Sequence, residues 1–462
     1  MSRSVFGMIL ISIMLFSGCK TLAPELEKPI DLSIPEHFSM DAGGSEVIKN
    51  WWESFNSDEL NALIKTALDQ NFDLKTLKTK IVQEKAKVEK EEASFWPDLG
   101  FSFGGQTQGV QVKESSDSGS SYDGSHSWNG GLSGSYTLDA WGEAEADRQA
   151  QMSNLMAAEQ NLSSSTLELT ADIAETWIDI IAVRNKRDIL DKQIKVNQTL
   201  LDLLTLRFAN GKADALDVSQ QREALAEAGS QVPLLEKQER VLLNNLAFLS
   251  GKTTIDTLDV VATLLPEPIP LPRIGIPSNL LENRPDIAAA KMRLSSSQWE
   301  VSAARADLLP SFQLSAQALF SSGTLDLLFN NWVATLGASI TGPIFDGGFR
   351  KAEVKRVRAV AQEQLNLYAK TVANAIYQVE DSLVSIVKQK AYIQRLEQEL
   401  EVVRLTLKDA SLQYQNGQSS YLSYLIAWTK IQRLERQLVG EKAVYIKERI
   451  GLYRALGWNA TT

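Results

Sequence analysis

The amino-acid sequence repeats itself, because a series of short landmarks in its first half returns in the same order in its second half. The matching pairs are Asn71-Phe72-Asp73-Leu74 with Arg284-Pro285-Asp286-Ile287, Trp96-Pro97-Asp98-Leu99 with Leu309-Pro310-Ser311-Phe312, Leu138-Asp139-Ala140-Trp141-Gly142 with Phe345-Asp346-Gly347-Gly348, and Arg207-Phe208-Ala209-Asn210-Gly211 with Gln413-Tyr414-Gln415-Asn416-Gly417. A repeated order of landmarks predicts two copies of one structural unit. We expect these repeats over residues 58–265 and 278–462, joined by a proline-rich segment at residues 266–277.

Each repeat is expected to begin with a helix and two strands and to end with two very long helices. The opening helix of the first repeat is predicted over residues 58–93, because Pro97 cannot continue it. Between residues 142 and 208 no proline occurs, and apolar side chains recur every three or four residues, which is the period of an amphipathic helix. At about 1.5 Å per residue this helix is about 100 Å long, too long for the core of one globular domain.

An Asn-Gly pair ends each of these long helices. Glycine readily adopts the left-handed conformation that reverses a chain, so turns are predicted at residues 209–213 and 415–419. Returning helices follow over residues 214–249 and 420–456. The fold is therefore expected to be mainly α, with two antiparallel coiled-coil hairpins, which alone would also fit a spacer or a stalk.

Four short segments alternate between apolar side chains and uncharged polar ones. They are predicted as strands over residues 98–108, 128–139, 311–320 and 331–341. The apolar faces comprise Leu99, Phe101 and Phe103; Trp128, Gly130, Leu132, Gly134, Tyr136 and Leu138; Phe312, Leu314, Ala316, Ala318 and Phe320; and Trp332, Ala334, Leu336, Ala338 and Ile340. Val333 is the exception on the polar side. This alternation is typical of a transmembrane barrel, and a soluble antiparallel sheet packed on a core is the alternative.

Four strands cannot close a barrel, because the smallest known barrels have about eight. An open sheet in lipid would leave unpaired backbone groups, each costing several kcal/mol. If the segments span a membrane, other copies of the chain must complete the barrel, and two, three or four copies are all physically possible. We therefore expect a homo-oligomer with a β-barrel contribution to its fold.

The first eighteen residues have the composition of a secretory signal peptide. Arg3 provides the positive start, and an apolar run over residues 5–16 has signal-peptide length, well below the roughly 20 residues of a spanning helix. Small residues then precede Cys19, the only cysteine. We expect cleavage after residue 18 and acylation of Cys19, including palmitate, with residues 19–57 forming a lipid-anchored extension.

Composition argues against catalysis and against nucleic-acid binding. The 2 His and 1 Cys are too few for a zinc cluster, a Cys/His nucleophile pair or an intrachain disulfide, and no cofactor motif occurs. The net charge is −10, and no basic segment is dense enough to follow a phosphate backbone. We therefore expect a non-enzyme without a cofactor or a metal ion, although a lone carboxylate pair remains open.

Taken together, the landmarks resemble the outer-membrane efflux proteins typified by TolC, most closely the lipidated branch typified by OprM and NodT. The residues that carry the resemblance are Trp51-Trp52, Phe55, Asp58-Glu59-Leu60, Asn71-Phe72-Asp73-Leu74, Asn283-Arg284-Pro285-Asp286-Ile287, Pro97, Pro310, Gly342-Pro343-Ile344-Phe345-Asp346-Gly347-Gly348 and both Asn-Gly pairs. The resemblance implies a homotrimer with a twelve-stranded barrel in the outer membrane and a twelve-helix periplasmic tunnel. It also implies partners: a periplasmic adaptor and an inner-membrane pump of the RND type.

The resemblance further places the two helical turns at the periplasmic end, where family members often carry a ring of carboxylates. Here Ile426 stands where the family usually has Asp. We therefore expect an apolar periplasmic gate formed by Leu422, with Tyr421 or Tyr424 beside it. Asp214 and Asp217 of the first hairpin are alternative gate residues, but acids in a first helical turn more simply complement the helix dipole.

The function predicted from these features is passive conduction of substrates out of the cell, as the outer-membrane component of a tripartite efflux system. Within the same class, type I protein secretion or metal export fits the sequence equally well. A lipid-anchored periplasmic coiled-coil scaffold without a pore is the alternative from a different class. The sequence does not identify the exported substrate.

Overall fold

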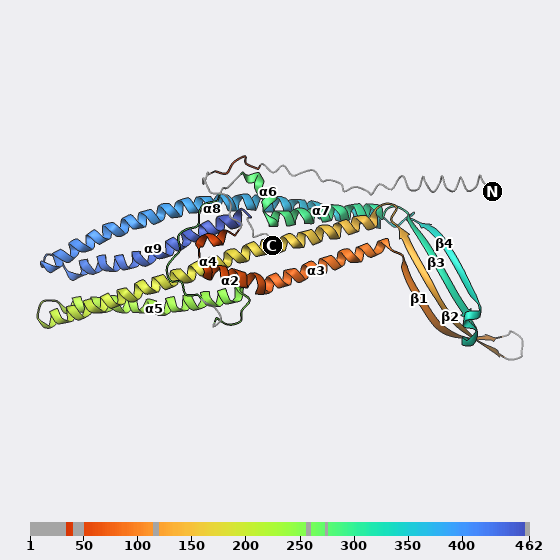
Figure 1. Ribbon diagram of the computed structural model, residues 1–462, viewed down its shortest axis with the longest axis horizontal. Coiled ribbons are helices and arrows are strands. Elements are labelled where there is room, and N and C mark those ends of the chain that lie inside the picture. Colours follow the sequence, from red (N-terminus) through yellow and green to blue (C-terminus); the bar gives the residue numbers. More distant parts are fainter. Residues whose placement is uncertain (1–33, 40–49, 114–119, 256–259, 273–275, 458–462) are drawn as a thin grey trace. The chain divides into compact units, whose positions relative to one another are not determined.

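The computed structural model describes residues 34–39, 50–113, 120–255, 260–272 and 276–457 (Figure 1). The predicted signal peptide and Cys19 lie outside these residues, as does most of the predicted extension. Two compact units alternate along the chain. We call Lys80–Ala158 with Ala289–Tyr368 the sheet unit, and Leu32–Thr79 with Glu159–Ala288 and Ala369–Thr462 the hairpin unit.

The sheet unit contains four antiparallel strands in the order β1 (Asp98–Lys113), β2 (Ser120–Leu138), β3 (Ser311–Ser322) and β4 (Trp332–Thr341). The pairing register sets Phe101 opposite Leu132, Leu132 opposite Ala318, and Ala318 opposite Ala334. Since directly paired residues share a face, the predicted apolar residues of all four strands lie on one side of the sheet. The prediction of four alternating strands is confirmed.

The first two strands are longer than predicted. We expected them to end at residue 108 and to begin at residue 128, with a polar loop between them. Pairing instead continues to Lys113 opposite Ser120. The expectation was wrong because the Ser- and Gly-rich composition was interpreted as a loop, whereas the hydrogen bonds of a two-stranded ladder come from the backbone and need no apolar side chains.

The long helices are α4 (Glu143–Ala209) with α5 (Ala215–Leu249), and α8 (Phe349–Gln415) with α9 (Tyr421–Ala455). They form the two expected hairpins, seen in Figure 1 as separate pairs. Gly211 and Gly417 reverse the chain with φ of 68° and 72°. The amide three residues beyond each helix closes the same bond, from Lys212 to the Arg207 carbonyl and from Gln418 to the Gln413 carbonyl, both at 2.8 Å.

The opening helix of the first repeat is divided in two, whereas one continuous helix was expected. Helix α2 (Asp58–Gln70) ends at Asn71, and α3 (Phe72–Glu92) begins directly after it. The Asn71 side-chain oxygen accepts hydrogen bonds from the amides of Asp73 and Leu74 at 2.9 and 3.0 Å. A short amide side chain competes with the helical backbone and caps a new helix, which explains the break. The second repeat has the corresponding pair α6 (Leu280–Asn283) and α7 (Pro285–Ala306).

Four short 3₁₀ helices complete the described elements: η1 (Trp51–Phe55), η2 (Ala93–Phe95), η4 (Pro277–Asn279) and η5 (Leu325–Asn330). Helix η1 supplies the centre of the hairpin unit's core. Trp51 is fully buried and stacks on Tyr453 of α9 with ring centroids 5.9 Å apart, while Phe55 packs against Trp177 of α4 at 6.2 Å. Large aromatic side chains dominate the burial energy of a core, so these contacts fix both hairpins at their bases.

The proline-rich joint packs on the same core where the structure describes it. Ile269 is buried, and the Pro270 carbonyl accepts a hydrogen bond from the Tyr453 hydroxyl at 3.0 Å. Within the described ranges, no helix of the protein is both long and apolar enough to cross a membrane.

Candidate functional site

Most of the apolar face of the sheet is exposed. Leu99 and Leu336, on the first and last strands, have 83% and 86% of their surfaces accessible. A contiguous exposed apolar surface of this kind is unusual on a soluble chain and marks contact with a partner or with lipid. Strands β1 and β4 have no neighbour on their outer sides among the described residues, so two backbone edges are open to pairing.

The opposite face of the sheet is polar, with two neighbouring exceptions. Leu319 of β3 lies directly opposite Val333 of β4. Val333 was recognised in the sequence, but Leu319 was not. It sits in the run Ala318-Leu319-Phe320, where three consecutive apolar residues hide the alternation. Where all four strands pair, the remainder of this face is lined by serine, threonine, glutamine, asparagine and glycine, with Asp98 at the start of β1, a composition suited to a water-filled lumen.

Aspartates cap the long helices where they follow the strands. Asp139 accepts hydrogen bonds from the amides of Ala144 and Glu145 at 3.3 and 3.1 Å. Asp346 accepts from the amides of Gly348 and Arg350 at 2.9 and 3.2 Å. In both repeats an aspartate between a strand and a long helix therefore caps the helix start.

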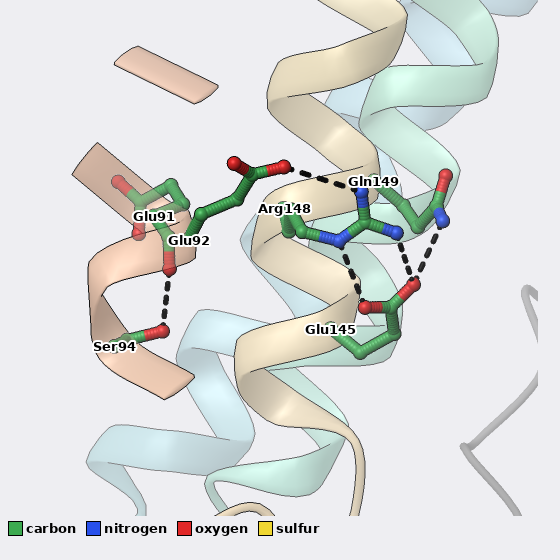
Figure 2. Close-up of polar contacts among 6 residues, drawn as sticks. All are labelled: Glu91, Glu92, Ser94, Glu145, Arg148 and Gln149. Carbon is green, nitrogen blue, oxygen red and sulfur yellow. Dashed lines mark hydrogen bonds and ion pairs between the residues drawn. The ribbon is translucent and has the colours of Figure 1, made fainter. Parts of the chain in front are cut away.

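A charged network links the end of α3 to the start of α4 (Figure 2). Arg148 donates to both carboxylate oxygens of Glu145 at 2.9 and 2.7 Å, and its other guanidinium nitrogen lies 3.8 Å from Glu92. Gln149 also donates to Glu145 at 2.7 Å. The bidentate pair lies within the first turns of α4 and fixes the Arg148 side chain, which then reaches α3 only through the longer ion pair to Glu92.

Asp147 faces acids from three neighbouring elements of the sheet unit. Burial, followed by the charges of Glu91, Glu300 and Asp139, raises the pKa of Asp147 from 3.8 to about 6. Glu143 has a pKa raised by burial and by Asp307, and only Arg350 opposes this shift. These side chains, apart from Glu300, line a cavity of about 480 Å³. Within the described ranges no cluster of His, Cys, Asp and Glu has an arrangement that could hold a metal ion.

The turn ends of the two hairpins contact each other through tyrosines. Tyr421, at the start of α9, is buried in an apolar cluster with Leu204, Val218 and Leu425. Its ring lies 5.4 Å from that of Tyr414 at the end of α8. The Arg207 guanidinium of α4 lies 5.0 Å from the Tyr414 ring centre, within the range of a cation–π contact.

Behind the tyrosines, a buried polar network joins α4 and α5 to α9. Asn197 accepts hydrogen bonds from the Trp428 indole at 2.7 Å and from the Gln432 amide at 3.1 Å, and it donates back to Gln432 at 3.3 Å. Gln221 donates to the Asn197 carbonyl at 2.8 Å and accepts from the Tyr421 hydroxyl at 2.6 Å. Asn197 and Gln221 are fully buried. Sequence reasoning missed this network.

The network continues along the same seam. Gln193 donates to the Gln432 carbonyl at 3.1 Å and to Glu435 at 3.2 Å, and it accepts from Arg436. Buried polar groups of this kind are costly unless they are paired, and here they pair with each other. The network therefore fixes the axial register of α9 against α4.

The predicted gate residues occupy different environments. Leu422 is exposed, and so is Ile426 one turn later on the same face of α9. Tyr424 is partly buried, with its ring 5.7 Å from Tyr421. Tyr421, expected beside the gate, is buried among apolar residues of both hairpins, and its hydroxyl donates to Gln221, which disfavours it as a gate residue within one protomer.

Asp214 and Asp217 lie at the start of α5, where a helix cap was the preferred interpretation. The Asp214 amide donates to the Asp217 carboxylate at 3.4 Å. Asp214 is exposed and Asp217 is partly buried. Both acids lie where the unpaired amides of a first helical turn create positive potential, which favours the capping role over an acidic gate.

A sheet with one exposed apolar face, one polar face and two open edges, combined with two long helical hairpins, defines the protomer of an outer-membrane channel. A family model described as outer membrane efflux protein matches residues 63–252 and 276–458, and the chain belongs to this family. The pyoverdine export outer membrane protein OpmQ of Pseudomonas aeruginosa is 31% identical, over 98% of this chain and 97% of its own.

Other relatives extend the comparison. Nodulation protein T of Rhizobium leguminosarum bv. trifolii is 26% identical over 96% of this chain and 94% of its own. Two solved outer-membrane channels share the fold. OprN superposes with a TM-score of 0.86 at 23% identity, covering 95% of this chain and 99% of its own. CmeC of Campylobacter jejuni gives 0.87 at 22% identity, covering 96% of both chains.

Proposed function

We propose that three copies of this chain form an outer-membrane duct that passively conducts substrates out of the cell. The exposed apolar face of the sheet, bounded by two open edges, carries this proposal. When β4 of one copy pairs with β1 of the next, every backbone edge is satisfied and the apolar faces form a continuous surface toward lipid. Three sheets of four strands give a barrel of twelve.

The alternation of the four strands makes this arrangement antiparallel throughout. Neighbouring strands run in opposite directions in the order β1-β2-β3-β4, so β4 and a second copy of β1 also oppose each other. The exposed Trp96, Ile344 and Phe345, which flank the two edge strands, are suited to bury surface at this seam. The hairpins of three copies supply twelve long helices for the periplasmic tunnel.

We further propose that Cys19 anchors the mature chain by acylation. The apolar run and the small residues before this single cysteine support the anchor. The partners of the duct are a periplasmic adaptor and an inner-membrane pump of the RND type. Relatives named as efflux pump outer membrane proteins support a role in such a system. The pump supplies the free energy, so this chain needs no catalytic residues and is not an enzyme.

The names of the relatives also favour small molecules over proteins as cargo. Among them are pyoverdine export, toluene efflux and antibiotic efflux outer membrane proteins. We therefore prefer small-molecule export to type I protein secretion. Leu422 and its exposed neighbour Ile426 remain the proposed residues of the periplasmic gate.

Two adjacent residues on opposite faces of β4 provide a matched test of the barrel. Leu336 points to the apolar side and Thr335 to the polar side. Leu336→Lys should greatly reduce the amount of folded trimer in the outer membrane, because a lysine near the middle of a lipid-facing surface costs about 2–4 kcal/mol. Thr335→Lys should assemble normally and shift the channel's ion selectivity toward anions. Equal assembly of both variants would contradict the lipid-facing assignment.

Two further measurements separate the duct from a scaffold. The purified acylated protein should produce discrete single-channel currents in a planar bilayer, whereas a coiled-coil scaffold should produce none. Cross-linking in the periplasm followed by affinity purification should recover an adaptor and a pump. A stable monomer without current would refute the proposal.

A further inference from the structure

Helix η5, between β3 and β4, folds back over the apolar face of the sheet. Leu328 is its buried residue, with 1% of its surface accessible. A Leu328 methyl carbon lies 3.8 Å from the position that a Cβ would occupy at Gly130. Leu328 is therefore seated over Gly130, next to Phe103 of β1.

The side of the sheet on which η5 lies follows from the register. Gly130 pairs with Phe103 and with Phe320, and all three belong to the apolar face. Phe329 of η5 packs edge-on against Phe320, with ring centroids 5.4 Å apart. Helix η5 therefore lies on the apolar face, opposite the polar side that faces the lumen in the proposed barrel. It connects the ends of β3 and β4 that are farthest in sequence from α7 and α8.

The outward side of η5 is apolar and exposed. Leu325, Leu327 and Phe329 have 52%, 47% and 73% of their surfaces accessible. Asp326 is the only charged residue between positions 322 and 331. Through the contact of Phe329 with Phe320, these side chains adjoin the exposed apolar surface of the strands. A short loop with this composition would be unfavourable in water, because it exposes three large apolar groups while burying one.

The strands near η5 carry aromatic side chains of the kind expected at a membrane interface. Phe103 stacks on Trp128 with centroids 6.0 Å apart, and Trp332 at the start of β4 is exposed. Aromatic girdles occur where the apolar band of a barrel meets the lipid headgroups. Helix η5 lies at this level, with Phe329 against Phe320 of β3 and Trp332 two residues beyond its end.

We propose that η5 is an interfacial anchor, which inserts Leu325, Leu327 and Phe329 into the outer leaflet at the boundary between headgroups and acyl chains. The occupant of this surface is lipid, because η5 extends the surface that already faces lipid in the proposed barrel. This inference rests on the proposed function, since the apolar face of β1 to β4 must itself contact lipid. The anchor would hold each protomer at a fixed depth in the membrane.

Site-directed fluorescence quenching tests the anchor. Single cysteines at Leu327 and Phe329 carry a bimane label, and the acylated protein is reconstituted in phosphatidylcholine vesicles brominated either close to the headgroup or close to the chain end. Leu336→Cys, at the middle of the apolar face, and Thr335→Cys, on the polar face, are the matched controls. The parent chain, whose only cysteine is Cys19, reports background labelling.

The expected result is a loss of fluorescence at positions 327 and 329 comparable to that at 336, but larger with the headgroup-proximal bromine, and no loss at 335. If position 336 is quenched while 327 and 329 behave like 335, η5 does not contact lipid and the anchor is refuted alone. Stronger quenching at 327 by the chain-end bromine would also overturn the interfacial position. If position 336 is not quenched, the lipid-facing barrel itself fails, and the anchor fails with it.

Discussion

Replacing Asn197 by alanine tests how the two hairpins of one protomer are held in register. The Asn197 side chain is fully buried on α4 and makes three hydrogen bonds to α9. Two involve Gln432 and the third involves the Trp428 indole, which has the shortest distance, 2.7 Å. Alanine removes all three bonds while leaving both partners in the interface.

The magnitude follows from the groups left without a partner. A buried donor or acceptor that loses its only partner costs about 1–3 kcal/mol. Asn197→Ala leaves the Trp428 N–H and both ends of the Gln432 side chain amide unsatisfied, although the 3.3 Å bond between the two amides is weak. We expect α9 to lose about 3 kcal/mol of local stability around these residues, by adding two such groups.

Hydrogen–deuterium exchange of the assembled protein, read by mass spectrometry on α9 peptides that contain residues 428–436, measures this local loss. Because 1.36 kcal/mol corresponds to a factor of ten in an opening equilibrium, the exchange rate should rise about a hundredfold. Gln198→Ala is the matched control. Gln198 follows Asn197 on α4 but is exposed and bonds only to Asp202, so its loss should change the rate less than about threefold.

A double variant separates lost hydrogen bonds from a general loss of packing. Trp428→Phe removes the indole N–H that Asn197→Ala leaves unpaired. Removing both partners of a buried bond costs less than removing one, so the combined effect should be smaller than the sum of the two single effects. Strict additivity, or an exchange rate in Asn197→Ala equal to that of the parent, would refute the argument that this network fixes α9.

Three further variants test other parts of the structure. Asp147→Asn should stabilise the protein at pH 7 by about 1 kcal/mol after allowance for solvent screening. The Asp147 pKa is raised from 3.8 to about 6, so the stability that this carboxyl group contributes is complete below pH 3.8 and is lost as the pH rises past 6. Denaturation midpoints of the variant should therefore depend less on pH across this window. Leu422→Ser should increase single-channel conductance of the resting state, and an unchanged closed state would count against a gate at this residue. Gly251→Ala should destabilise the protein by more than about 1 kcal/mol, because Gly251 has φ of 69° and a Cβ there would lie 2.3 Å from the Gln70 carbonyl oxygen. Thermal unfolding measures this loss, with Gly229→Ala in an open part of α5 as the control.

The elements with a strong periodic pattern could be predicted from the sequence. The long helices follow from uninterrupted apolar spacing, and their turns follow from Gly211 and Gly417, which adopt positive φ. The strands follow from alternation. The break at Asn71 was not predicted, because an asparagine inside an apolar pattern reads as a solvated helix position until its capping bonds are seen.

The candidate site was less predictable, since it depends on contacts between distant segments. Tyr421 is next to Leu422 in sequence but points into the core, because successive helical residues face different directions. Asn197 did leave a detectable pattern. It lies seven residues from Leu190 and seven from Leu204, both of which are buried, so it occupies an apolar heptad position. A polar residue at such a position is a recognisable indication of a register-specifying contact.

Helix α9 is held by two seams of different chemistry, and this difference has a mechanical consequence. Against α8 it packs through an apolar cluster of Leu396, Leu400, Val403, Ile431 and Leu434. Against α4 it packs through the amide network of Asn197 and Gln432. Apolar side chains accept small displacements because their attraction is not directional, whereas hydrogen bonds are lost when distance and angle change. Any displacement of α9 along α4 must therefore break the polar seam, whereas small shifts of α9 against α8 leave their apolar contacts in place. The register of the two hairpins is consequently set by a few buried amides in an otherwise apolar helical wall.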